Sequence, residues 1–465
     1  MARNRGDQRS FDWIIFSLYL SLAGLGVLMV YSVGQRETEM LGFFSSIAGK
    51  QVIWAVIAVF LFLVIFLVDW KVWQTLAYPI YGVTLLLLGA VLLFGREIKG
   101  ATSWFSFGGY SLQPSELAKF GTALALASYL GGFNTNLRLG RTQLTAMALF
   151  LLPVALVLLQ PDAGSALVFL SFFVALYREG LNPGYYLIAG GVIATTLLGL
   201  VLPGAMVAAI FLAIAALFLG YGSGLPFSWG AGALFWIVVT VVLLREEFVQ
   251  AALFANMILA GVAGTYLVLK KGFRPVVATG MVLGAALGIS LTAGFAFHNV
   301  LRPHQRERIN VWLQPSKSDP RGALYNVLQS KMAISSGGIQ GKGFLNGEIT
   351  RLNYVPEQAT DFIFCTIGEE HGFIGSATTI ILFLVLLYRM VLLAERQRSN
   401  FSRVYAYGVA GVLFVHFFVN IGMTMGIMPI IGIPLPMLSK GGSSLLGFTL
   451  LIGVMLKLDS HRYQI

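Results

Sequence analysis

Residues 47–68 read IAGKQVIWAVIAVFLFLVIFLV, and the part from 52 to 68 contains no charged side chain. A helix rises 1.5 Å per residue, so about 17–25 apolar residues cross the roughly 30 Å hydrocarbon core of a bilayer. The whole chain has this character, since 57% of its 465 residues are hydrophobic and 11% are charged. Soluble domains carry about 25% charged residues. The sequence therefore predicts an all-α polytopic membrane protein.

Apolar windows along the chain predict about fourteen membrane spans. They are 12–33, 47–68, 73–94, 114–131, 142–160, 163–178, 183–202, 204–220, 231–245, 250–269, 275–297, 361–388, 404–427 and 441–457. A long polar stretch, 298–360, precedes the last three. Apolar residues recur at helical spacing between 322 and 336, which predicts a short surface helix there.

The formal net charge of +11 does not indicate a nucleic-acid partner. The basic residues stand in short connections between spans, which is how orientation in a membrane is encoded. With fourteen spans, Lys270, Lys271, Arg274 and the basic cluster at 389–403 fall on the same side as the N-terminus. We therefore expect both termini inside and residues 298–360 outside.

Charged residues within membrane spans are costly, so they are candidates for function. Residues 113–119 read QPSELAK and open the fourth span from its outer side. Pro114 suits the first turn of a helix, and Glu116 and Lys119, three residues apart, share a helix face. Either the two form a structural ion pair, or Lys119 meets an anionic ligand while Glu116 holds it.

Residues 354–364 read YVPEQATDFIF and place Asp361 at the outer start of a long apolar span. Asp361 is either a first-turn carboxylate favoured by the helix dipole or a functional group. Glu369 and Glu370 follow at a depth where an unpaired carboxylate is expensive. We interpret His371 as a hydrogen-bonded core residue, because no second histidine stands at ligand spacing.

Three further motifs carry weaker signals. Residues 160–164 read QPDAG, and Asp162 is predicted to cap the following helix. Residues 433–444 read IPLPMLSKGGSS, whose glycine-rich helix start either cradles phosphate or permits close packing. Residues 337–343 read GGIQGKG but are not a P-loop, since no Ser or Thr follows the lysine.

Taken in order, these motifs resemble the shape, elongation, division and sporulation (SEDS) family of RodA and FtsW. The matching segments are 113–119, 160–162, 356–364, 368–370, 420–423 and 441–444. Together they extend over most of the chain, and residues 352–358, LNYVPEQ, are more similar to RodA than to FtsW.

The chain also departs from the family pattern. The family usually has ten spans, so the resemblance implies one membrane domain over 1–465 with about four inserted helices near 200–270. The outer loop at 298–360 then precedes the last three spans. Ala359 stands where a histidine is usual, and Lys440 where a tyrosine is usual.

The resemblance implies a peptidoglycan glycosyltransferase that polymerises lipid II during cell elongation and releases undecaprenyl diphosphate. Asp361 is then the expected general base. The expected substrate-binding residues are Glu116, Lys119, Glu357, Lys440, Ser443 and Ser444. The resemblance leaves open whether the reaction uses a divalent cation, Mg²⁺ or Mn²⁺. The implied partners are a class B penicillin-binding protein and the elongation machinery, in the bacterial inner membrane with both termini cytoplasmic.

Two other classes of protein also fit the composition. A transporter of lipid-linked cell-wall precursors would show as many spans and as many intramembrane charges. A non-catalytic scaffold for a partner enzyme would need no reactive residues. The motif match, and not the composition, favours the polymerase.

Overall fold

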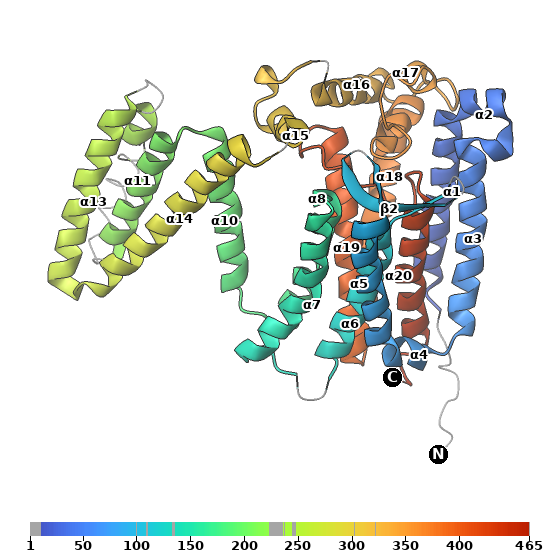
Figure 1. Ribbon diagram of the computed structural model, residues 1–465, viewed down its shortest axis with the longest axis horizontal. Coiled ribbons are helices and arrows are strands. Elements are labelled where there is room, and N and C mark those ends of the chain that lie inside the picture. Colours follow the sequence, from blue (N-terminus) through green and yellow to red (C-terminus); the bar gives the residue numbers. More distant parts are fainter. Residues whose placement is uncertain are drawn as a thin grey trace. The chain divides into compact units, whose positions relative to one another are not determined.

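The computed structural model describes residues 11–98, 100–107, 110–132, 135–222, 236, 238–243, 248–301, 303–320 and 322–464. Most of this chain is helical (Figure 1). It divides into two compact units: Met1–Asn182 together with Ser318–Ile465, and Pro183–Lys317. Each unit is described by itself.

The first unit is a helical bundle with a small sheet. Its helices are α1 (Trp13–Val33), α2 (Gln35–Leu41), η1 (Phe43–Ser45), α3 (Ile47–Leu67), α4 (Trp70–Thr75), α5 (Ala77–Phe94), α6 (Pro114–Leu130), α7 (Gly140–Leu159), α8 (Ala163–Phe169), α9 (Phe172–Arg178), α16 (Ala323–Ser336), α17 (Glu348–Arg351), α18 (Ile363–Glu395), α19 (Asn400–Thr424) and α20 (Gly442–Ser460). The strands β1 (Arg96–Ile98), β2 (Ala101–Phe107) and β3 (Tyr110–Leu112) pair in that order, antiparallel.

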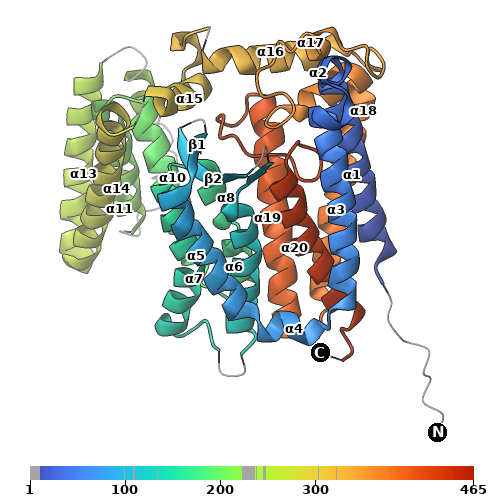
Figure 2. The same ribbon diagram turned by 45° about the vertical axis from the view of Figure 1, so that its right-hand side comes forward.

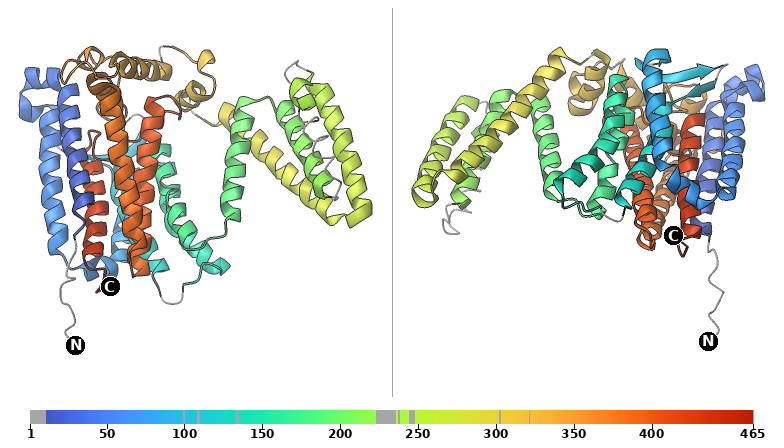
Figure 3. Two further views of the ribbon diagram at one scale, coloured as in Figure 1. Left: turned by 180° about the vertical axis from the view of Figure 1, so that it is seen from behind. Right: turned by 60° about the horizontal axis from the view of Figure 1, so that its bottom comes forward.

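The centre of this bundle is formed by α19 and α20. In each of them 83% of the residues in the most apolar stretch are buried, against 22% in α3. Helix α19 packs on α6 and α18, while α18 also packs on α1 (Figure 3). Helices α2, α16 and α17 lie at one end of the bundle, and α4 lies at the other (Figures 1 and 2). The short helix expected between 322 and 336 is confirmed as α16.

The second unit is a separate group of helices. They are α10 (Gly184–Val201), α11 (Gly204–Gly222), α13 (Val249–Lys271), α14 (Arg274–Asn299), α15 (Pro303–Leu313) and η2 (Pro315–Lys317). Helix α11 packs on α13 and α14, and α10 packs on α14. A Cβ at Gly199 would lie 2.5 Å from the carbonyl oxygen of Ser290, so this contact needs a glycine. The predicted insertion, 200–270, falls within this unit.

Ten helices of the described residues are long and apolar enough to cross a membrane: α1, α3, α5, α7, α10, α13, α14, α18, α19 and α20. The spans predicted at 114–131, 163–178 and 204–220 coincide with α6, with α8 and α9, and with α11. The span predicted at 231–245 lies largely outside the described residues. A total of fourteen is therefore not confirmed, whereas a multi-pass helical membrane protein is.

The three-stranded sheet corrects the expectation of an all-α fold. It fills the connection between α5 and α6, where Arg96 pairs with Trp104 and Phe105 with Leu112. Two of the strands have only three residues, and the seven residues of β2, ATSWFSF, do not alternate strictly between apolar and polar side chains.

Helix α18 is broken at Gly372, which has φ 63° and ψ −156°. The backbone groups freed by the break pair with the loop at 338–343. The bonds are Lys342 N to Glu369 O (3.0 Å), Gly343 N to Glu370 O (2.9 Å), Phe373 N to Gly338 O (2.9 Å) and Ile374 N to Ile339 O (3.1 Å). Since buried backbone groups need partners, the loop completes the helix. The glycine-rich segment 337–343, which the sequence excluded as a P-loop, therefore has a structural role.

We expect Gly341→Ala to destabilise the protein more than Gly338→Ala. Both glycines have positive φ, which costs other residues about 1–3 kcal/mol. A Cβ at Gly341 would also lie 2.1 Å from the Glu370 carbonyl oxygen, whereas one at Gly338 meets open space. Thermal unfolding in detergent measures the difference. Equal losses for both variants would mean that the loop does not pack tightly on α18.

Candidate active site

The two charged residues of α6 form a buried ion pair. Pro114 opens the helix at its first turn, as predicted, and Glu116 also lies in that turn. Lys119 Nζ lies 2.7 Å from Glu116 Oε1, and the two side chains are 1% and 2% exposed. They are buried because α6 packs between α5, α19 and α20. The shared face predicted for them is confirmed.

His416 on α19 is a second partner of Lys119, with Nζ and Nε2 2.8 Å apart. An ammonium group only donates hydrogen bonds, so Nε2 accepts and the imidazole proton lies on Nδ1. Nδ1 then donates to the carbonyl oxygen of Pro434, 3.0 Å away. The Phe448 ring lies 5.5 Å from Nζ and adds a cation–π contact. The ammonium group is thus enclosed on three sides.

Asp361 lies just before α18, whose N-cap is Phe362 and whose first turn holds no acidic residue. Glu357 sets this position. Its carbonyl oxygen accepts the amides of Thr360 (3.2 Å) and Asp361 (3.0 Å), and its carboxylate accepts the Thr360 hydroxyl (3.1 Å). Glu357 has φ 59°, a strained conformation for a residue with a side chain. Such strain often marks a functional turn.

Helix α19 links Asp361 to the buried pair. Asn420 Nδ2 donates to the carbonyl oxygens of Asp361 (2.9 Å) and Ile433 (2.7 Å). His416 lies one turn earlier on the same face of α19. Its Nδ1 donates to the carbonyl oxygen of Pro434, the residue after Ile433. Asp361 Oδ2 lies 3.5 Å from where a Cβ of Gly432 would be. The chain at 432–434 therefore contacts Asp361 on one side and the partner of Lys119 on the other.

The glycine-rich start of α20 packs closely on α3. Gly441 N donates to Gln51 Oε1 at 3.2 Å, and a Cβ at Gly442 would lie 2.1 Å from the Trp54 ring. Ser443 and Ser444 follow in the first turn, and both are buried. Close packing, one of the two interpretations of this motif, accounts for Gly442, whereas a Cβ at Gly441 would lie 3.4 Å from the Ser444 side chain, an ordinary contact.

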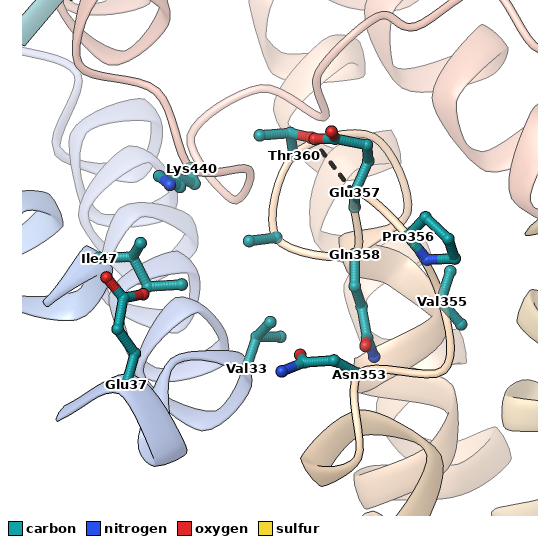
Figure 4. Close-up of a pocket in the computed structure, with 11 residues that line it drawn as sticks. Val33, Glu37, Ile47, Asn353, Val355, Pro356, Glu357, Gln358, Thr360 and Lys440 are labelled. Carbon is teal, nitrogen blue, oxygen red and sulfur yellow. Dashed lines mark hydrogen bonds between the residues drawn. The ribbon is translucent and has the colours of Figure 1, made fainter. Parts of the chain in front are cut away.

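A pocket of about 310 Å³ opens beside Thr360, the residue before Asp361, at the end of the bundle that carries α2 (Figure 4). It is lined by Val33, Glu37, Ile47, Asn353, Val355, Pro356, Glu357, Gln358, Ala359, Thr360 and Lys440. The backbone amide of Lys440 donates to Ala359 O at 2.8 Å and joins two of its walls. Of the predicted site residues, Glu357 and Lys440 line this pocket, and the others are not among its lining residues.

Asp162 and Glu369, which the sequence also singled out, make contacts that stabilise the fold. Asp162 caps α8 as predicted, since Oδ1 accepts Ser165 N at 2.9 Å. Its Oδ2 accepts Gln113 Nε2 at 2.9 Å, which ties two motifs together. Glu369 is fully buried and accepts Lys342 Nζ at 2.9 Å, together with the amide and hydroxyl of Thr350 at 2.8 Å.

The interpretation of His371 is wrong. Its side chain is half-buried, and its buried Nδ1 has no hydrogen-bond partner in the described part of the chain. The nearest ring is that of Phe344, 6.4 Å away between centroids. Across the described residues, no group of three or more His, Cys, Asp or Glu side chains could hold a metal ion.

Sequence reasoning assigned no role to His416, Asn420, Glu37 or Asn353, although segments 420–423 and 352–358 carry the family resemblance. A single histidine or asparagine in an apolar helix gives no spacing signal, and the partner of His416 is 297 residues away. Glu37 and Asn353 lie on segments that only the folded chain brings together.

A bundle of membrane-length helices with a buried ion pair and a polar mouth defines a polytopic membrane protein with a site at one membrane surface. The model of the FtsW, RodA and SpoVE family, described as cell cycle protein, matches residues 12–212 and 203–464. The chain belongs to this family.

Relatives and solved structures agree with this assignment. The chain is 33% identical to peptidoglycan glycosyltransferase RodA of Treponema pallidum (strain Nichols), over 97% of this chain and 98% of the relative. It is 29% identical to peptidoglycan glycosyltransferase MrdB of Escherichia coli (strain K12), over 98% and 95%. A structure described as "Structural coordination of polymerization and crosslinking by a peptidoglycan synthase complex" matches with TM-score 0.63 and 26% identity, over 98% and 99%. The RodA crystal structure from Thermus thermophilus, at TM-score 0.55 and 24% identity over 98% and 99%, shares the fold.

Proposed function

We propose that this protein is a peptidoglycan glycosyltransferase that joins lipid II disaccharide units into glycan strands during cell elongation. The family membership and the names of the full-length relatives support this activity. The observation that supports the mechanism is that one face of α19 contacts both parts of the site. Asn420 bonds the backbone carbonyl of Asp361, and His416, one turn earlier, contacts Lys119 of the Lys119–Glu116 pair.

In the proposed reaction, a sugar hydroxyl of the acceptor attacks the anomeric carbon of the donor. Asp361 takes the hydroxyl proton as the new C–O bond forms. The bond between the anomeric carbon and the phosphate oxygen breaks, and undecaprenyl diphosphate leaves. A single displacement inverts the α-linked donor to a β-linked product. It needs one general base, because pyrophosphate leaves without a proton donor.

Lys119 supplies positive charge close to the developing pyrophosphate. A charge in a water-excluded site acts more strongly than one in water. Glu116 Oε1 holds the ammonium group, while Glu116 Oε2 is buried with no hydrogen-bond partner in the described chain. Such a group is expected where a remaining partner arrives with the substrate. We assign Lys440, Ser443 and Ser444 to binding of the pyrophosphate of lipid II. We assign Glu357 to binding of its sugar.

A divalent cation, Mg²⁺ or Mn²⁺, stays part of this proposal, because Mg²⁺ needs only one or two protein carboxylates when it also binds substrate phosphates. Polymerisation measured with and without Mg²⁺ or Mn²⁺ decides whether a cation binds together with the pyrophosphate.

The same proposal places the protein in the bacterial inner membrane, with both termini cytoplasmic and the end carrying α2, α16 and α17 outside. We also propose that the chain has about fourteen membrane spans, as predicted from the sequence, and that about four of them are inserted relative to the family. A class B penicillin-binding protein is the proposed partner, supported by the similarity to a protein from a complex that polymerises and crosslinks peptidoglycan.

The purified full-length chain, reconstituted in liposomes with lipid II, tests this function. Glycan strands should form without any other protein. Movement of lipid II across the bilayer without polymer would instead favour a transporter. An inert chain that restores the activity of a partner enzyme would favour a scaffold.

His416→Phe should lower kcat of polymerisation at nearly unchanged KM for lipid II. The variant keeps a ring against Phe448 but removes both the acceptor for Lys119 and the donor to Pro434. His416→Gln, which keeps an acceptor and a donor, should recover part of kcat. If the two variants are equally active and equally stable, His416 does not position Lys119.

A further inference from the structure

A second cavity, of about 430 Å³, adjoins the pocket beside Asp361 and is lined by Arg36, Glu37, Met40 and Asn353. Glu37 and Asn353 line both cavities, so the two form one trough. Figure 4 shows Lys440 and Thr360 toward one end of the first pocket and Glu37 and Asn353 toward the other. Thr360, at one end of the first pocket, directly precedes Asp361, the proposed base.

The lining of the trough suits a sugar better than a phosphate. Its polar groups are the carboxylates of Glu37 and Glu357, the amides of Asn353 and Gln358, the hydroxyl of Thr360, the ammonium of Lys440 and the guanidinium of Arg36. Two carboxylates against two cations leave no net positive charge in the trough, so its lining does not select for a pyrophosphate. Carboxylates, amides and hydroxyls are the hydrogen-bonding partners that the hydroxyl groups of a glycan require. Lys440 remains at the end nearest the start of α20.

The backbone on one wall of the trough is held in an uncommon shape. Asn353 has φ 53° and Glu357 has φ 59°, both left-handed conformations that side-chain-bearing residues rarely adopt. These two residues bracket the turn that forms this wall. Asparagine tolerates this conformation, whereas at Glu357 it costs about 1–3 kcal/mol, strain that is retained where the surrounding structure fixes a functional geometry.

We infer that this trough is a saccharide subsite that holds the glycan strand beyond the reacting sugar, with Glu37 and Asn353 as its outer contacts. The inference rests on the proposed polymerase function. A strand held there stays on the enzyme between additions, so the subsite controls strand length rather than the rate of each bond formed.

The test compares two substitutions with a matched control on the same short helix. Glu37→Gln removes a carboxylate from the trough, and Asn353→Gly removes the amide while keeping the left-handed backbone. Glu39→Gln is the control, because Glu39 is exposed, lies outside both cavities and bonds Gln35. Residues two apart on a helix point to different sides.

Strand length is measured by gel after polymerisation of lipid II in liposomes, together with the initial rate of lipid II consumption. Glu37→Gln and Asn353→Gly should shorten the strands about 2–10-fold, the effect of losing one net hydrogen bond. The initial rate of lipid II consumption by both trough variants should match that of wild type. Glu39→Gln should make strands of wild-type length. Wild-type strand lengths in both trough variants, or a slower rate with unchanged length, would overturn the subsite.

Binding of a soluble, lipid-free glycan fragment of disaccharide repeats separates this inference from the proposed function. Wild type should bind the fragment about 2–10-fold more tightly than Glu37→Gln. A chain that makes polymer but binds the fragment no better than Glu37→Gln overturns only the subsite. A chain that binds the fragment at Glu37 but makes no polymer keeps the subsite and overturns the polymerase.

Discussion

Replacing Asp361 with asparagine should lower the rate of glycan polymerisation by about 10²–10⁴-fold, the range for loss of general acid–base catalysis. The amide has nearly the same shape as the carboxylate but cannot take up the proton of the attacking hydroxyl. The fold should be retained, since the bond from Asn420 goes to the backbone carbonyl of Asp361 and not to its side chain.

The measurement is strand formation from lipid II by purified protein, with thermal unfolding as the check on folding. Asp69→Asn is a matched control, because Asp69 caps α4 at the opposite end of the bundle and asparagine also caps helices. It should polymerise like wild type. An Asp361→Asn variant as active as wild type would remove Asp361 as the base.

Replacing Lys119 with methionine should both destabilise the protein and abolish polymerisation. Glu116 would be left as an uncompensated buried carboxylate, and breaking a buried pair typically costs about 3–5 kcal/mol. The free energy of unfolding in mixed detergent measures this loss. Glu116→Gln combined with Lys119→Met removes both charges and should recover most of the stability.

The double variant separates structure from chemistry. If the ammonium group stabilises the leaving pyrophosphate, the recovered fold should still be inactive. If the double variant polymerises like wild type, the pair is only structural, which is one of the two interpretations that the spacing of Glu116 and Lys119 permits.

The positions of the spans could be predicted because the apolar length of a membrane helix is fixed by bilayer thickness. The break at Gly372 could not, because it depends on a loop at 338–343 that supplies the missing hydrogen bonds. The strands at 96–112 likewise depend on pairing between segments that do not alternate strictly between apolar and polar side chains.

The site residues also differ in whether the local sequence reveals them. Glu116, Lys119 and Asp361 stand out because charges in apolar surroundings are rare. His416 and Asn420 do not, because a neutral polar side chain in a helix costs less and gives no spacing pattern. Their roles follow only from the carbonyl groups of Ile433 and Pro434, which the fold brings against α19.

The sequence separation between Lys119 and His416 also has a consequence for biosynthesis. A ribosome adding about 5–20 residues per second needs roughly 15–60 s to make the intervening 297 residues. During that time α19 and α20, which pack against α6 and its ion pair, have not yet been made. We therefore expect a chain truncated before α19 to leave the Lys119–Glu116 pair without two of the helices that bury it.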